Sequence, residues 1–115
     1  MKEKNTKMII DLEYLRGVID GDKEFENELK EVFFDNAQKN INSLQDAIDK
    51  KDNNLWYMSA HAFKGASGSI GAFDLAKVLE IAQRSFEDSS ENKIQILSKV
   101  KSEFALVKDL FEKGI

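Results

Sequence analysis

Apolar residues recur at intervals of three and four along most of this chain, and no proline interrupts them. Such spacing places the apolar side chains on one face of an α-helix. Because proline breaks helix interiors, its absence allows each apolar stripe to continue as one helix. The pattern therefore predicts an all-α fold.

Capping residues and glycines divide this pattern into five expected helices. Asp11 caps a short first helix that Gly21 ends, and Asp22 caps a long second helix. The run of residues 50–54 is the break before the third helix, whose N-cap is Asp52.

The third helix leads to a turn at Gly71, and the fourth extends from there to the polar run of residues 87–92. The fifth continues to Gly114, which stops it. The positions expected to face the core are Leu12, Leu15 and Val18 or Ile19 in the first helix; Phe25, Leu29, Val32, Phe33, Ala37, Ile41, Leu44 and Ile48 in the second; Leu55, Ser59, Ala62, Phe63, Ala66 and Ile70 in the third; Phe73, Ala76, Leu79, Ala82 and Phe86 in the fourth; and Ile94, Leu97, Val100, Phe104, Val107, Leu110 and Phe111 in the fifth.

Four long helices joined by short loops predict an antiparallel up-and-down four-helix bundle, with the short N-terminal helix as a lid. A length of 115 residues, 42% of them hydrophobic, is sufficient for one core. We therefore expect residues 1–115 to form a single domain, with residues 1–8 as a polar, flexible tail.

The composition argues against several classes of function. Without cysteine the chain forms no disulfide and no thiolate metal site, which suits a reducing cytoplasm. No apolar run approaches the roughly 20 residues that cross a bilayer, and the N-terminus lacks an apolar signal core, so no membrane contact is expected. A net charge of −4 argues against non-specific nucleic-acid binding. Residues 53–86 nevertheless carry three basic and two acidic side chains, a balance that suits an acidic partner or a phosphoryl group.

The segment from Ser59 to Gly71 contains His61, the only histidine of the chain. On a helix, His61 lies outside the row of residues that is expected to face the core. The residues within about 60° of it are Tyr57, Lys64, Gly65 and Gly68. A glycine in a helix interior costs roughly 1 kcal/mol relative to alanine, and two of them without a packing role indicate that something approaches the backbone closely. We therefore expect a partner to dock beside His61.

The same segment, H-A-F-K-G-A-S-G-S-I-G-A, resembles the signature of histidine-containing phosphotransfer (HPt) domains, roughly H-x-L-K-G-x-(small)-x-x-(apolar)-G-(small). The positions that match in register are His61, Lys64, Gly65, Ile70, Gly71 and Ala72. Phe63 stands where the family usually has leucine, and Ala62 where threonine is frequent. Both departures concern packing and not chemistry. The resemblance identifies the chain as a single HPt-like domain.

The resemblance implies that His61 receives a phosphoryl group on Nε2 from an aspartyl phosphate of a receiver domain and passes it to another receiver. Lys64, three residues later, would neutralise phosphoryl oxygens as a point charge. Gly65 and Gly68, with Tyr57, would provide the access and docking surface for the in-line approach of the receiver.

The family often carries a glutamine or glutamate on the next helix facing the imidazole, and Gln83 stands at that position. A hydrogen bond from Nδ1 of His61 to Gln83 would fix the tautomer and leave Nε2 as the nucleophile. The neighbouring Arg84 is an alternative residue to reach the site and support it electrostatically.

The sequence has no glycine-rich phosphate loop and no acidic cluster for magnesium, so we expect a carrier without its own ATP site, metal or other cofactor, and not an enzyme. Zinc takes three or four ligands, and His61 has no second histidine or cysteine to join it. The expected partners are receiver domains of response regulators and hybrid histidine kinases, which would bring metal and aspartate, and the expected state is a monomer. A histidine kinase dimerisation domain would need an ATP-binding domain. The other alternative is a non-catalytic helical adaptor or docking module.

Overall fold

The computed structural model describes residues 9–113, and this part of the chain contains five α-helices and no strand. The helices are α2 (Leu12–Ile19), α3 (Lys23–Lys50), α4 (Asn53–Ser69), α5 (Phe73–Arg84) and α6 (Ser90–Glu112). The prediction of an all-α fold is confirmed. Within residues 9–113 no helix combines the length and the apolar character required to cross a membrane. The predicted tail of residues 1–8 and the predicted stop at Gly114 lie outside the described residues.

Side-chain caps begin four of the five helices. Asp11, Asp22 and Asp52 each accept a hydrogen bond from the backbone N–H three residues later, which confirms the three predicted N-caps. Ser89 does the same for α6, which begins inside the polar run that was expected to separate the last two helices. Each such cap satisfies a backbone donor that the helix leaves free and contributes about 1 kcal/mol.

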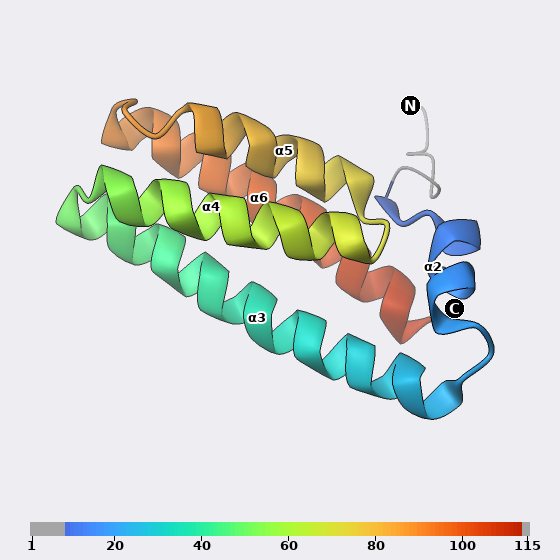
Figure 1. The fold of residues 1–115 in the computed structure, drawn as a ribbon. Coiled ribbons are helices and arrows are strands. Elements are labelled where there is room, and N and C mark those ends of the chain that lie inside the picture. Colours follow the sequence, from blue (N-terminus) through green and yellow to red (C-terminus); the bar gives the residue numbers. More distant parts are fainter. Residues whose placement is uncertain (1–8, 114–115) are drawn as a thin grey trace, which may run out of the picture.

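The four long helices lie alongside one another and enclose the core (Figure 1). α4 contacts α3 and α5, and α6 contacts the same two helices, so the contacts close a ring. α2 lies at one end and contacts α3. The largest fully buried side chains are Trp56, Phe63, Ile10, Leu15, Leu44, Ile70, Leu75, Leu79, Val100 and Val107. This packing fixes α4 and α5 as neighbours, and the candidate site lies across them.

The buried face of α4 differs by about one residue from the predicted stripe. Trp56 is fully buried, whereas the predicted stripe contains Leu55 in that turn and Ala62 further along, and Ala62 is exposed. The indole fills more of the core, and its Nε1 donates a hydrogen bond of 2.7 Å to the carbonyl oxygen of Ala82. This rotation of the helix still leaves His61 exposed.

Besides Ala62, three residues that were predicted to face inward are exposed: Phe25 (38%), Val32 (57%) and Ile94 (54%). α3 has 28 residues and α4 has 17, so the first turns of α3, which carry Phe25, extend beyond α4. The inward position next to Val32 is taken by Phe33, which is buried. On α6 the residue before Ile94 is Lys93, whose side chain is buried in its place.

The turn between α4 and α5 holds α2 in place. Gly71 has φ +80°, and its carbonyl oxygen accepts a hydrogen bond of 2.9 Å from the backbone N–H of Asp11. A Cβ at Gly71 would lie 3.1 Å from Cδ1 of Tyr14 and 3.2 Å from the backbone carbonyl oxygen of Asp11. Glycine is therefore required here both by the backbone conformation and by the close approach of the chain before α2.

Candidate functional site

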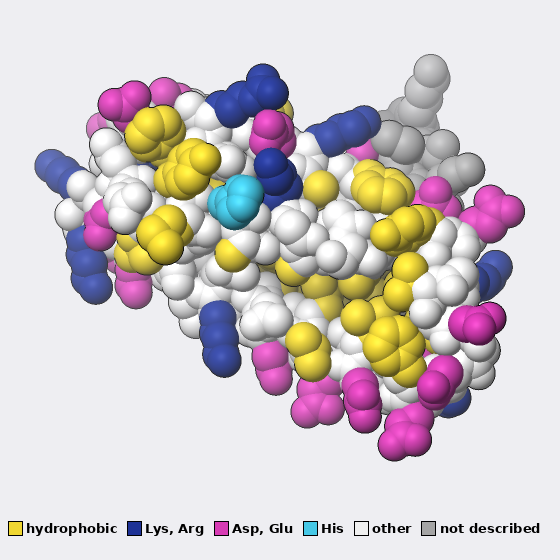
Figure 2. Space-filling model, viewed as in Figure 1, with side chains coloured by type: hydrophobic (Ala, Val, Ile, Leu, Met, Phe, Trp, Pro, Cys, Tyr) yellow, Lys and Arg dark blue, Asp and Glu magenta, His cyan; other side chains and the backbone are white. Residues whose placement is uncertain are grey.

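His61 lies exposed on α4, at the surface that α4 shares with α5. Figure 2 shows the imidazole at the surface, with basic and acidic side chains beside it. Its Nδ1 lies 3.3 Å from Oε1 of Gln83 on α5. An amide oxygen only accepts, so this contact requires the proton on Nδ1 and leaves the lone pair on Nε2.

Gln83 is held in turn by Tyr57. The Gln83 Nε2 donates a hydrogen bond of 3.0 Å to the Tyr57 hydroxyl, which orients the amide with its oxygen toward His61. The Tyr57 ring stacks parallel to the imidazole, with an interplanar angle of 1° and centroids 6.3 Å apart. These contacts join the three side chains in one cluster, with Tyr57 bonded to Gln83 and Gln83 in contact with His61.

Lys64 lies one turn further along α4 and contacts α5 as well. Its Nζ donates a hydrogen bond of 3.0 Å to Oε2 of Glu80. The other carboxylate oxygen of Glu80, Oε1, lies 3.3 Å from Nε of Arg84. The hydrogen bond from Lys64 lowers the pKa of Glu80 most strongly, and the charges of Lys64 and Arg84 add to it, while desolvation opposes it. Glu80 is therefore an ionised carboxylate with a cation on each oxygen.

Two of the side-chain contacts between α4 and α5 lie at consecutive turns of both helices. His61 on α4 contacts Gln83 on α5. Lys64, three residues after His61, contacts Glu80, three residues before Gln83. The two helices therefore run in opposite directions at this place, and the two contacts lie about one helical turn apart. Lys64 therefore lies one helical turn from His61, on the same side of α4 that faces α5.

Gly65 and Gly68 leave open space over α4. A Cβ built on either glycine would meet no atom within 4 Å outside its own neighbourhood on the helix. No contact among the described residues therefore requires glycine at either position. The absence of these side chains lowers the surface of α4 in the turns that follow His61, as expected for a surface that a partner approaches closely.

The structure brings together most of the predicted site residues. His61, Gln83 and Tyr57 form one cluster, and Lys64 lies one helical turn away. Arg84 contacts Glu80, and its electrostatic support of the site stays a prediction. Glu80 is not among the site residues predicted from the sequence. Glu80 is three residues from Gln83, just as Lys64 is three residues from His61. This shared spacing could have predicted a contact between Glu80 and Lys64.

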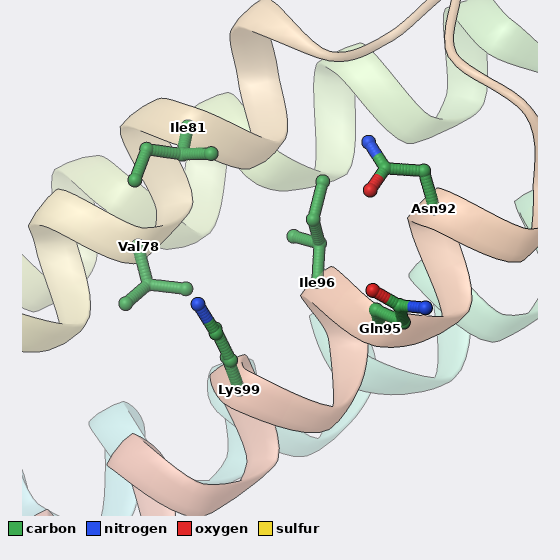
Figure 3. A pocket seen from close by; sticks show the side chains of 6 residues that line it. All are labelled: Val78, Ile81, Asn92, Gln95, Ile96 and Lys99. Carbon is green, nitrogen blue, oxygen red and sulfur yellow. The ribbon is translucent and has the colours of Figure 1, made fainter.

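Two of the surface hollows near these helices border α5 or the loop that follows it. One, open to solvent, is lined by Asn53, Asn54, Tyr57, Phe86 and Glu87. The other, of about 150 Å³, lies between α5 and α6; Figure 3 shows Val78 and Ile81 on one side of it and Lys99 extending toward them from the other. The second hollow contains none of the predicted site residues. Among residues 9–113 no group of three or more histidine, aspartate or glutamate side chains is placed to hold a metal ion.

Comparison with known proteins identifies the family and the fold of the chain. The sequence model of the Hpt domain family matches residues 28–110, which include all of α4 and α5. Comparison with curated proteins gives no significant match. Among solved structures, the crystal structure of histidine-containing phosphotransfer protein B (HptB) from Pseudomonas aeruginosa PAO1 is similar, with a TM-score of 0.83 and 24% identity over 91% of this chain and 92% of that chain. At this identity the likeness establishes a shared fold.

Proposed function

The chain belongs to the Hpt domain family, and on that premise we propose that it is a phosphorelay carrier that takes a phosphoryl group from one receiver domain onto His61 and passes it to another. The observation that carries this proposal is the orientation of the imidazole. Its Nδ1 is engaged by Gln83, and Nε2 has no hydrogen bond with any of the described residues. The open surface at Gly65 and Gly68 supports the approach of a folded partner.

The chemistry requires only a nucleophile from this chain. The Nε2 lone pair of His61 attacks the phosphorus of the aspartyl phosphate, the N–P bond forms as the P–O bond to aspartate breaks, and the carboxylate leaves. The Nδ1 proton stays on the ring and continues to donate to Gln83, so the phosphorylated ring carries a positive charge. When the phosphoryl group moves on, the ring leaves as neutral imidazole. A hydrogen bond to Nδ1 therefore supports transfer in both directions.

The same proposal includes the finer architecture. Residues 1–115 act as one monomeric domain, an antiparallel up-and-down four-helix bundle with α2 as its lid; the closed ring of helix contacts and the bond from Asp11 to Gly71 support this. The partners are receiver domains of response regulators and hybrid histidine kinases. They bring the aspartate and the metal, and this chain carries no ATP site or cofactor of its own.

Incubation with a panel of phosphorylated receiver domains tests the function. A carrier takes the label from at least one of them and gives it to a second, unphosphorylated receiver. An adaptor or docking module would instead bind a receiver without gaining label. Co-elution without label would therefore favour the alternative function.

We expect Gln83→Leu to let the neutral imidazole of His61 adopt both tautomers. Without the amide oxygen, Nδ1 loses the acceptor that holds its proton, so the ring nitrogens exchange roles in part of the population. Long-range ¹H–¹⁵N NMR of the ring should show the Nδ1–H form in the parent and a mixture in the variant, with phosphoryl transfer slower by about tenfold or more. Gln38→Leu on α3 is the matched control. An unchanged tautomer and an unchanged rate in Gln83→Leu would contradict the orienting role.

We expect Lys64→Ala to slow transfer without unfolding the protein. The Lys64–Glu80 pair is a partly exposed surface ion pair, and surface pairs contribute roughly 0–1 kcal/mol, so the melting temperature should change little. Loss of a charge beside the developing phosphoryl charge should slow transfer on the order of tenfold. Lys64→Arg should recover part of the rate, because the charge is restored. Lys77→Ala, another lysine substitution on the α4–α5 pair, is the control. If neither Lys64 variant changes the rate, Gln83, Arg84 or the partner holds the phosphoryl group.

A further inference from the structure

Glu80 connects the two cations of the candidate site. It lies on α5, and its carboxylate gives one oxygen to Lys64 at 3.0 Å and the other to Arg84 at 3.3 Å. The Arg84 side chain is 78% exposed. Arg84 lies one helical turn after Glu80 on α5, so their contact is a local i,i+4 pair. The contact with Lys64, in contrast, joins α5 to α4.

The Glu80 carboxylate that contacts Lys64 is ionised at neutral pH. Because the pKa of Glu80 is lowered, mainly by its hydrogen bond with Lys64, the carboxylate stays ionised at neutral pH. Any stability that the pair contributes is present above the ordinary carboxyl pKa and is lost as the pH falls through the lowered value. The lysine that is expected to meet the phosphoryl group is thus already paired with an anion.

A phosphoryl group on His61 would compete for the same ammonium. Side chains three residues apart on a helix have Cβ atoms about 5–6 Å from each other, and the four-carbon stem of Lys64 allows its Nζ to turn from Glu80 to the imidazole. The incoming group carries about −1.5 to −2 charge and three acceptor oxygens, against the single charge of Glu80. Glu80 and the phosphoryl group would therefore compete for one ammonium group.

We propose that Glu80 is a positioning residue of the phosphoryl transfer: it holds the Lys64 ammonium beside His61 before transfer and competes for it afterwards, so that His61 retains its phosphoryl group less strongly. This inference rests on the proposed carrier function. No covalent bond changes at Glu80; only an ionic contact is exchanged. The consequence suits a carrier, since a group that is held too firmly would not be passed to the next receiver.

The equilibrium distribution of label between a receiver and this domain tests the proposal. Removal of the competing charge in Glu80→Gln should shift the distribution toward phosphohistidine by about two- to fivefold, the range of an exposed ion pair. In the Lys64→Ala background the same substitution should have no effect, because there is no ammonium to release. Glu26→Gln is the matched control, since Glu26 on α3 also contacts two lysines, Lys23 and Lys30.

Two results would overturn the proposal. If Glu80→Gln leaves the distribution unchanged, Glu80 does not compete for Lys64. If it shifts the distribution equally with and without Lys64, Glu80 acts by direct repulsion or through the fold, and the positioning role is wrong.

A second measurement separates this proposal from the carrier function. Phosphoramidate, a small phosphoryl donor, can phosphorylate His61 without any receiver, and NMR of the lysine ammonium groups can then follow Lys64. The Lys64 signal should move on phosphorylation, and Glu80→Gln should change it before phosphorylation. Failure of every receiver to transfer label would overturn the carrier function alone, whereas a Lys64 signal that is unchanged in both comparisons would overturn the role of Glu80 alone.

Discussion

His61→Gln is expected to take no phosphoryl label from any receiver. Glutamine keeps a polar side chain of similar reach but has no ring nitrogen lone pair to attack phosphorus, and no second histidine exists in the sequence to replace it. The expected loss is complete within detection. The parent protein should carry label that is lost in acid and kept in alkali, because an N–P bond behaves in this way.

The fold of this variant should be unchanged. His61 is exposed, and exposed substitutions usually change the free energy of unfolding by less than about 0.5 kcal/mol. Circular dichroism and the melting temperature provide that control. If a folded His61→Gln protein still took up label, the nucleophile would be another side chain and the assignment of the site would be wrong.

Gly65→Leu is expected to fold normally and still block transfer. The transfer rate should fall on the order of a hundredfold or more, because Nε2 of His61 and the phosphorus atom would no longer meet in the required geometry. A Cβ at Gly65 meets no atom within 4 Å, so leucine enters without a clash inside the chain. Leucine is also the better helix former, by roughly 0.8–1 kcal/mol. The added side chain would occupy the open surface beside His61, where the phosphorus of the receiver has to come to about 3–3.5 Å of Nε2.

The matched control is Gly17→Leu on α2, where a Cβ also meets no atom within 4 Å. That variant should keep the parent rate, and Gly65→Ala should fall between the parent and Gly65→Leu because it adds only one methyl group. A rate that stays at the parent value in Gly65→Leu would show that the opening over α4 has no role in the approach of the partner.

The sequence by itself determined the helices and the outward position of the histidine. Both depend on short-range interactions. Asp11, Asp22 and Asp52 cap the backbone three residues ahead, so an N-cap can be predicted without knowledge of any other helix. His61 lies far enough from the apolar stripe that a rotation of α4 by one residue does not bury it.

The depth of burial of individual side chains was decided by the tertiary structure. Leu55 and Trp56 are adjacent and apolar, and only the space between α4 and α5 selects the indole, whose Nε1 reaches the Ala82 carbonyl. Phe25 fits the periodicity of α3 yet lies beyond the end of α4, a matter of relative helix length. A periodic pattern shows which face is apolar but does not show what covers it.

The pairing across α4 and α5 was also decided by the tertiary structure. Lys64 could be predicted beside His61 because the two are three residues apart on one helix. Its partner Glu80 is sixteen residues further along the chain, and the contact exists only in the register that places Gln83 opposite His61. That register is set by how buried side chains on both helices pack together, and a local spacing rule contains no information about it.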